Sequence, residues 1–364
     1  MSIIVFIVVI VVLIVVHEFG HFVVAKLTGM RVDEFGLGYP PRALTIKKVG
    51  ETEYTLNWLP FGGFVKIYGE DGGGADPRSF SARPRILQAL VLVAGVAMNL
   101  LFAYVLITGA LVAGTPRALS DDEVLIARDT QLMVANVVPA SPAALAGLAP
   151  GDAILSAEDG QYTFSGVDPK AFTEFVARGK GNTSIALSVQ HADRKIETIV
   201  ARPIAGLIAT DPSRAVLGVE VATIGVVSLS LPAALVEGAR LTWGALILTA
   251  EGLWHFFYGI FTFSADLSQV AGPVGIAGVV GSASMQGLGN LLSIMAIISI
   301  NLALINLIPV PALDGGRLLF VIVESIIRRP IKASVAHAIN AVGFVLLILL
   351  MLVVTAHDIF KIVG

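Results

Sequence analysis

An apolar run near the start of the chain is interrupted by two histidines and a glutamate. Residues 3–16 are all aliphatic or aromatic, and the apolar character resumes at 22–25. The combined segment reaches the roughly 20 residues that cross a bilayer as a helix. Each ionisable side chain in such a helix costs about 2.5 to 3.5 kcal/mol on insertion scales. The cluster of His17, Glu18 and His21 therefore indicates a functional site within a membrane span.

These three residues form the pattern HExxH, which is typical of zinc hydrolases. On a helix, His17 and His21 are four residues apart and share one face, where two imidazoles can bind one metal ion. Glu18 lies beside them, where it can take a proton from water at the metal. The alternative is two hydrogen-bonded helix histidines near a carboxylate. That alternative would leave three polar groups in hydrocarbon without a function, so zinc is favoured.

Composition indicates an integral membrane protein that also has some regions outside the membrane. Hydrophobic residues make up 55% of the 364 residues and charged residues 14%, compared with about 45–50% and about 25% in soluble domains. The net charge of −3 and the lack of a basic face argue against a nucleic-acid partner. Cysteine is absent, so a zinc site must use His, Asp or Glu. The first apolar segment lacks the features of a cleaved signal peptide, so we expect it to be retained.

The fold class that follows is a polytopic α-helical membrane protein with four transmembrane helices, a small membrane-associated β-hairpin region and one inserted α/β module. The second span carries Gln88 and Asn99 as its main polar interruptions. The four predicted spans are residues 1–27, 86–114, 288–316 and 338–356.

Residues 228–263 are apolar enough to suggest a further span, yet charged residues recur along them. Trp243, Trp254 and Tyr258 are of the types that favour the membrane interface. We therefore expect interfacial amphipathic helices here rather than a span. The sequence GPVG at 272–275 is expected to break the helix that precedes it.

Residues 28–85 are predicted to contain the β-hairpin region. The stretches 43–48 and 53–58 alternate apolar and polar residues on either side of a turn, and a third short strand is expected at 63–68. A small sheet with an open edge can hold an extended peptide by strand addition. A plain loop with a hydrophobic backing is the alternative.

Residues 125–205 are predicted to form a compact α/β module between the second and third spans. A helix of small residues is followed at 147–154 by the pattern Gly-x-x-x-Gly-Asp-x-Ile, which resembles a PDZ domain of the bacterial protease type. An unrelated small β-rich domain is the alternative. The expected elements are strands at 133–138, 183–190 and 195–201 and a helix at 170–178.

The third span ends in NLIPVPALDGG, residues 306–316. Two prolines with this spacing cannot lie inside a regular helix, so the backbone is expected to unwind where Asp314 lies. Irregular backbone at membrane depth is tolerated only where it is buried in protein or lines a wet cavity. Asp314 is therefore predicted to be a third metal ligand. Without HExxH, a span that ends in a turn and a cap would be the preferred interpretation.

The distribution of Lys and Arg along the chain predicts that the HExxH motif and the segment with Asp314 meet. Residues 26–85 contain nine Lys or Arg and residues 317–332 contain four, which assigns both segments to the cytoplasm. Both termini and the inserted module then lie outside. His17 is about 21 Å along the helix from Ile3, past the bilayer midplane on the cytoplasmic side. Asp314 is expected at a similar depth, at the cytoplasmic end of the third span.

The motifs HEFGH and NLIPVPALDGG, with a PDZ-like module between spans two and three, together resemble the site-2 protease family of intramembrane zinc metalloproteases. The resemblance covers nearly the whole chain and is closest to the bacterial regulator-of-sigma-E branch. It implies zinc held by His17, His21 and Asp314, with Glu18 as the general base. Enterobacterial members look like tandem-PDZ proteins, whereas this chain has room for one such domain.

The resemblance also implies how a substrate is held. Asn306 would engage the substrate backbone near the scissile bond. Gly63, Phe64 and Val65 would belong to a membrane-dipping hairpin that receives the unwound substrate strand. The implied substrate is a single-span membrane protein, such as an anti-sigma factor already trimmed outside by another protease, with remnant signal peptides as further candidates.

The implied location is the bacterial inner membrane, in contact with lipid, with a periplasmic PDZ domain that filters substrates by size or binds a newly formed peptide C-terminus. Two other functions remain open from the residues alone: a proton or metal relay in a transporter, and a catalytically silent scaffold. The remaining histidines have no partner at ligand spacing and are interpreted as ordinary surface or interface residues: His191, His255, His337 and His357.

Overall fold

Two compact units make up the chain in its computed structural model. The first contains residues 1–113 and 230–364, and the second contains residues 114–229. Because the chain leaves the first unit and later returns to it, the second unit is an insertion. The structure describes residues 2–70, 76–179, 183–191, 195–206, 213–262 and 271–363.

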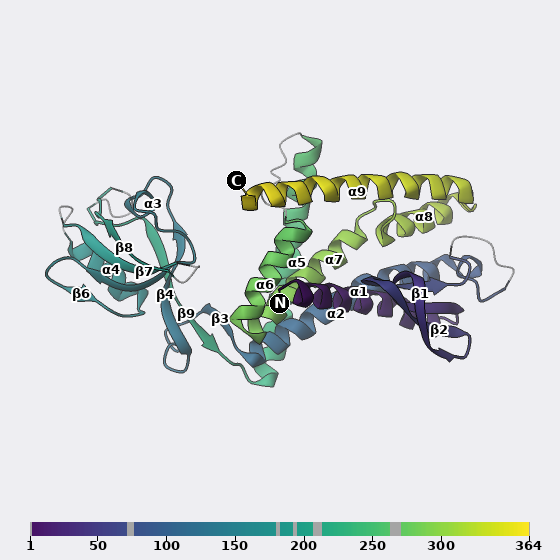
Figure 1. The fold of residues 1–364 in the computed structure, drawn as a ribbon, viewed down its shortest axis with the longest axis horizontal. Coiled ribbons are helices and arrows are strands. Elements are labelled where there is room, and N and C mark those ends of the chain that lie inside the picture. Colours follow the sequence, from purple (N-terminus) through teal and green to yellow (C-terminus); the bar gives the residue numbers. More distant parts are fainter. Residues whose placement is uncertain are drawn as a thin grey trace. The chain divides into compact units, whose positions relative to one another are not determined.

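The first unit is built from α-helices and a β-hairpin (Figure 1). Its helical elements are α1 (Ser2–Leu27), the 3-10 turn η1 (Phe80–Ala82), α2 (Arg85–Ala113), α5 (Leu231–Phe261), α6 (Pro273–Gln286), α7 (Leu288–Leu307), α8 (Asp314–Ile327) and α9 (Ala333–Val363). Among the described residues, five helices are long and apolar enough to cross a membrane by length and composition: α1, α2, α5, α7 and α9. The predicted spans fall on four of these, and α5 is the fifth candidate.

Helices α1, α2 and α7 pack together through a buried apolar cluster. Leu13 on α1, Ala103 on α2 and Ile300 on α7 are fully buried within it. Small residues such as Ala103 let helices approach closely, which favours association in lipid. At Gly20 of α1 an added Cβ would clash with the carbonyl oxygen of Ala94 on α2. The HExxH segment of α1 is thereby held against the backbone of α2.

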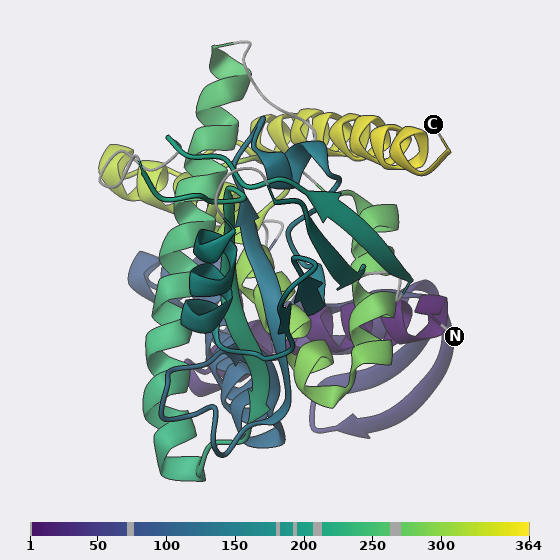
Figure 2. The same cartoon turned by 90° about the vertical axis from the view of Figure 1, so that its left-hand side faces the viewer.

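In place of the several interfacial helices predicted at 228–263, the structure has one continuous helix, α5, and residue 263 lies outside the described residues. Pro232 lies at the first turn, where proline is compatible with a helix, and the charged residues that follow do not interrupt the backbone hydrogen bonds. Trp243 and Trp254 are exposed. Figures 1 and 2 show α5 running across the direction of α1 and α2 rather than alongside them.

The segment predicted as a single span at 288–316 is interrupted. Helix α7 ends at Leu307, an irregular stretch follows, and α8 begins at Asp314 itself. The backbone therefore unwinds before Asp314 rather than at it. Pro309 and Pro311 stop α7 because proline lacks an N–H and restricts the residue before it, whereas a new helix can begin beyond them.

The GPVG sequence that was expected to break a helix begins one. Gly272 is the N-cap of α6 and Pro273 occupies its first turn. The buried carboxylate of Asp358, near the end of α9, accepts the N–H groups of Gly272 at 3.2 Å and Gly275 at 2.8 Å. This negative charge at a helix N-terminus is favourable and joins α9 to α6. Helix α9 extends beyond the predicted span at 338–356 in both directions.

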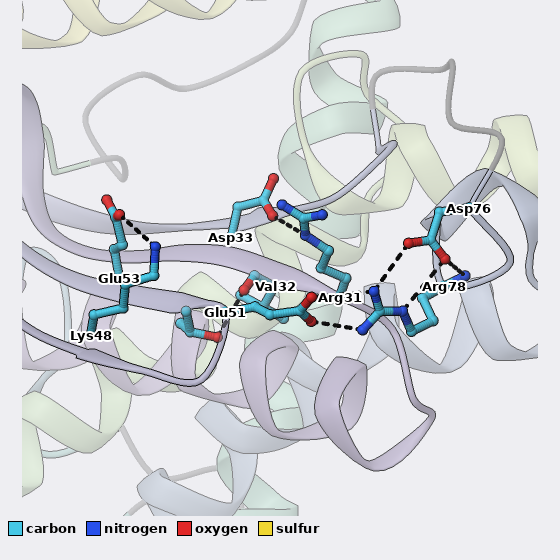
Figure 3. Close-up of polar contacts among 9 residues, drawn as sticks. Arg31, Val32, Asp33, Lys48, Glu51, Glu53, Asp76 and Arg78 are labelled. Atoms are coloured by element: carbon cyan, nitrogen blue, oxygen red, sulfur yellow. Dashed lines mark hydrogen bonds and ion pairs between the residues drawn. The ribbon is translucent and has the colours of Figure 1, made fainter.

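The β-hairpin consists of β1 (Val32–Val49) and β2 (Thr52–Ile67), which pair antiparallel. Polar contacts fix its turn to the loop before α2 (Figure 3). Arg78 Nη1 donates to Glu51 at 2.7 Å, and the Arg78 side chain also contacts Asp76 at 3.2 Å. The Thr52 hydroxyl donates to the carbonyl oxygen of Val32 at 2.8 Å. A single exposed ion pair contributes only about 0.2–1 kcal/mol to stability, so several such contacts are needed to hold the hairpin.

The third short strand expected at 63–68 is part of β2 rather than a separate strand. Residues 63–66 pair with 34–37 of β1, and 34–37 also pair with 53–56. Residues 34–37 are therefore central and 63–66 lie at an edge of the small sheet. The Gly62 backbone has a φ of +85°, a conformation that glycine adopts without the steric cost of a side chain and that lets the chain turn back within β2.

The second unit is a seven-stranded sheet with short helices (Figure 2). Its strands follow the order β3-β9-β4-β5-β7-β8, with β6 paired to β5. Phe172 of α4 and Leu187 of β7 lie in its buried core. The elements are β3 (Thr115–Ala118), β4 (Arg128–Val137), α3 (Pro142–Leu145), β5 (Ala153–Glu158), β6 (Thr163–Phe164), α4 (Pro169–Arg178), β7 (Ile185–Gln190), β8 (Ile196–Ala201) and β9 (Val219–Val227).

The predicted module boundaries at 125–205 are too narrow. Strand β9 lies beyond 205 and pairs antiparallel with β4, and β3 lies before 125 and pairs with β9. Leu217, which is 1% exposed, belongs to the same core. Strand pairing is a long-range contact, so the local pattern after residue 205 did not reveal that the sheet needed these strands.

Candidate metal centre

His17 and His21 lie one turn apart on α1, as the HExxH spacing predicts. Their Nε2 atoms are 3.1 Å apart, and their rings meet edge to face at a centroid distance of 4.8 Å. Both side chains are buried, with exposed fractions of 6% and 7%. Two imidazole nitrogens therefore point at one position inside the protein.

Asp314 brings a carboxylate to the same position from a distant part of the chain. Its Oδ2 is 2.8 Å from Nε2 of His17 and 3.2 Å from Nε2 of His21. Among the described residues, these three form the group of His, Asp or Glu side chains that could hold a metal ion. The meeting of the two motifs, which charge asymmetry predicted from sequence, is thus present in the fold.

The donor set fits zinc. Zinc prefers nitrogen and oxygen ligands at about 2.0 Å, and a tetrahedron of that size places its ligand atoms about 3.3 Å apart. The three observed separations, 2.8, 3.1 and 3.2 Å, are a little shorter than this. Three protein ligands with a fourth position left for water or substrate are the arrangement of catalytic rather than structural zinc sites.

The turn before α8 depends on residues that lack side chains. An added Cβ on Gly315 would clash with the carbonyl oxygen of Ile308, and one on Gly316 would clash with that of Val310. The two glycines let the first turn of α8 fold back against the irregular stretch that follows α7. Asp314 precedes them in the first turn of α8, where a carboxylate is favoured by the helix dipole.

Helix α2 supplies contacts to the outer nitrogens of both histidines. The Nδ1 of His21 lies 2.7 Å from the carbonyl oxygen of Val91, and the Nδ1 of His17 lies 3.2 Å from the amide nitrogen of Asn99. Between them, Gly95 faces the rings, and a Cβ there would lie 2.5 Å from Nε2 of His21. Partners of this kind orient the ligands of metal sites.

These α2 residues were not predicted to belong to the site. Asn99 was noted only as a polar interruption in an apolar span, and Gly95 four residues earlier gave no separate signal. Their spacing places residues 91, 95 and 99 on one helical face. A polar residue in an apolar span together with a glycine one turn away is the signal that could have suggested the contact.

Glu18 lies beside the metal-binding group and next to the edge of the hairpin sheet. Its Oε2 accepts the backbone N–H of Val65 at 3.1 Å. Gly63 is close as well, because a Cβ there would lie 3.8 Å from Cγ of Glu18. The predicted hairpin residues therefore adjoin the predicted base. The ring of Phe64 is directed differently, toward Gly36 in the neighbouring strand.

Asn306, near the end of α7, lies at the same site. Its amide nitrogen is 3.5 Å from Nε2 of His17, and the residue is half-buried. The amide N–H groups of Asn306 can donate hydrogen bonds to an acceptor atom that lies beside the metal position. The structure thus brings together His17, Glu18, His21, Asn306 and Asp314, together with the backbone of residues 63–65.

His191 in the second unit has carboxylate neighbours but a different arrangement. Its Nδ1 is 2.9 Å from Oδ1 of Asp152, and its Nε2 is 3.5 Å from Oε2 of Glu197. The two carboxylates approach opposite nitrogens of one ring, so the three groups do not converge on a point.

A sequence model described as "Peptidase family M50" matches residues 5–350. A protein of Clostridium perfringens named as a zinc metalloprotease is 36% identical over 349 residues, which cover 95% of each chain. Proteins with the same kind of name from Nostoc sp. and Synechocystis sp. are 34% and 33% identical, covering 96% and 95% of this chain and 93% and 91% of theirs.

One of the solved structures that resemble this chain is a PDZ domain. The PDZ domain of an SdrC-like protein from Listeria innocua is 23% identical, with a TM-score of 0.21, and covers 25% of this chain and 92% of that domain. With that score, the PDZ fold of the second unit stays a prediction.

Proposed function

Because the chain belongs to peptidase family M50 and is a zinc metalloprotease, we propose that it hydrolyses peptide bonds within the spans of single-span membrane proteins. The zinc ion is held by His17, His21 and Asp314. The observation that carries the proposal is the convergence of these three donor atoms beside Glu18, with both histidines on α1, a helix apolar enough to cross a membrane. A protein that only relays ions would not need this combination.

When bound, zinc supplies Lewis acidity that makes water a nucleophile near neutral pH. Glu18 is the general base and takes a proton from the attacking water. Its Oε2 accepts the N–H of Val65, which fixes the carboxylate and leaves Oε1 for the proton. A base must lie within hydrogen-bond reach of the proton that it takes, and Glu18 is on the same helical turn as the histidines.

The edge strand and Asn306 hold the unwound substrate. The Val65 N–H is directed away from the sheet toward Glu18, so the backbone groups of Gly63, two residues earlier, face the same side. An extended substrate can pair with that edge by strand addition. Asn306 donates its amide N–H to a substrate carbonyl near the scissile bond. Backbone groups freed from a substrate helix are costly in a membrane unless they find such partners.

We place the protein in the bacterial inner membrane with α1, α2, α7 and α9 as spans and α5 at the interface. Support for the interfacial position of α5 comes from its direction across α1 and α2 and its exposed Trp243 and Trp254 (Figures 1 and 2). With these four spans, both termini and the second unit are periplasmic, and the metal site is near the cytoplasmic side of the membrane. Lipid covers the exposed apolar faces of the spans.

The substrate is an anti-sigma-factor-like protein that another protease has already trimmed, with remnant signal peptides as a second source. Removal of the outer domain creates a free C-terminus. The second unit, as a PDZ-like domain, binds that C-terminus or excludes substrates that are still too large. Removing residues 115–229, with a linker in their place, is then expected to relax substrate selection while cleavage continues. Complete inactivity of a well-folded deletion would count against this role.

The decisive experiment is cleavage of a single-span model substrate in liposomes by the full chain. Wild type, Glu18→Gln and the control Glu251→Gln, which changes an exposed glutamate on α5, are compared, with zinc content measured in each. Cleavage by wild type and Glu251→Gln alone, with about one zinc per chain in all three samples, supports the proposal. Absence of zinc from all three samples overturns it.

A further inference from the structure

Asn99 is fully buried on α2, and within the described part of the chain only one end of its amide has a partner. Its Nδ2 is 3.2 Å from Nδ1 of His17. Its Oδ1 is buried and has no hydrogen-bond partner among the residues that the structure describes. A buried acceptor without a partner costs about 1–3 kcal/mol, so this side chain requires an explanation.

The neighbouring histidine indicates which tautomer the site uses. Nδ1 of His21 lies 2.7 Å from the carbonyl oxygen of Val91, and a carbonyl can only accept. His21 therefore carries its proton on Nδ1 and keeps the lone pair of Nε2 for a metal. Nε2 of His17 points at the same position, so His17 needs the same tautomer, with a proton on Nδ1. That proton requires an acceptor, and the Nδ2 group of an amide is a donor.

We propose that Asn99 presents its carbonyl Oδ1 to His17, accepts the Nδ1–H and is a positioning residue for the first zinc ligand. Rotation of the side-chain amide by half a turn exchanges its oxygen and its nitrogen without moving another atom, so packing does not favour either orientation. The His17 tautomer does, because a proton on Nδ1 favours the orientation in which Oδ1 faces it. In this orientation the orphaned oxygen gains a donor. The inference rests on the proposed zinc site.

The surroundings hold Asn99 in place for this role. The hydroxyl of Ser299 on α7 donates to the backbone carbonyl of Asn99 at 2.8 Å, which fixes α2 at this level. Gly95, one turn earlier, has no side chain, so both imidazoles fit against the same face of α2. Helix α2 thus provides a backbone carbonyl for one histidine and a side-chain carbonyl for the other.

The test measures zinc affinity of the full chain in detergent, by competition with a chelator and without substrate. Asn99→Leu removes the acceptor at similar volume, Asn99→Asp keeps an oxygen acceptor, and Asn99→Ala serves if the leucine variant fails to fold. The control Thr108→Val removes another buried polar group from α2, away from the site. Visible absorption of the cobalt(II)-loaded protein reports the coordination directly.

Asn99→Leu or Asn99→Ala is expected to weaken zinc binding about 10- to 100-fold and to alter the cobalt spectrum. Asn99→Asp and Thr108→Val are expected to behave as wild type. Unchanged affinity in the leucine and alanine variants overturns the proposal, and so does an equal loss in Asn99→Asp with the fold intact. Failure of the zinc site itself is distinguishable, because then neither wild type nor His17→Ala binds zinc.

Discussion

The protein contains two histidine–carboxylate clusters with nearly the same closest distance and different consequences. In the first unit Nε2 of His17 is 2.8 Å from Asp314, and in the second Nδ1 of His191 is 2.9 Å from Asp152. At the first cluster, three donor atoms converge and the outer nitrogens of the histidines have partners of their own. At the second, two carboxylates approach opposite nitrogens of a single ring. Convergence of donors, rather than proximity of one pair, distinguishes a metal site.

The largest effect is expected from Asp314→Asn, which removes a ligand charge from the converging cluster. Because a ligand contributes more than its supporting contacts, zinc affinity should fall by more than about 100-fold, and activity should fall with it. Chelator competition and a cleavage assay measure the two quantities. Full zinc occupancy with lost activity would instead assign Asp314 to the substrate.

Gly95→Ala should disturb the same cluster from the side of α2. The added Cβ would meet both imidazoles, and overpacking typically costs about 1–3 kcal/mol, so both zinc affinity and thermal stability should decrease. Gly109→Ala is the matched control on the same helix, since its Cβ would meet only Leu292 Cδ1 at an ordinary 3.5 Å. Equal behaviour of the two variants would show that the close approach of α2 does not position the ligands.

Asp152→Ala tests the second cluster, where no metal is expected. Asp152 is 3% exposed and also accepts the backbone N–H of Ala149 at 2.9 Å, so its removal takes an acceptor from both Ala149 and His191. We expect about 1–3 kcal/mol of lost stability in the second unit, measured by hydrogen exchange of its strands in the full chain. The zinc content should stay the same, and a lower content would place a metal at His191.

The smallest effect is a pH dependence of the second unit. The hydrogen bond to Asp152 raises the pKa of His191 above its ordinary value of 6.5. Because the folded-state pKa is raised, the stabilisation is complete below 6.5 and is lost as the pH rises through the folded-state value. Exchange protection, corrected for intrinsic rates, should therefore decline from acidic to alkaline pH in wild type.

His191→Gln should remove that dependence without changing zinc binding. A pH profile identical in wild type and His191→Gln would contradict the assignment of the effect to this pair.

Much of the first cluster could be predicted, because its parts are encoded locally. The four-residue spacing of His17 and His21 places them on one face in any α-helix, and two prolines before Asp314 predict a break. The predicted position of that break was wrong, because the chain unwinds earlier and Asp314 starts a new helix. The roles of Gly95 and Asn99 were missed, because one glycine and one polar residue mark a face of α2 without showing that this face meets α1.

The sequence by itself determined that His17, Glu18 and His21 share an apolar segment long enough to cross a membrane as a helix, since helical periodicity and hydropathy are local properties, and its motifs resemble those of zinc metalloproteases. Only the tertiary structure decided which face of α2 supports the histidines, where β9 completes the inserted sheet and how the edge at Val65 reaches Glu18. A span that is apolar on nearly every side does not show in its sequence which side meets protein and which meets lipid. Packing between distant segments makes that choice.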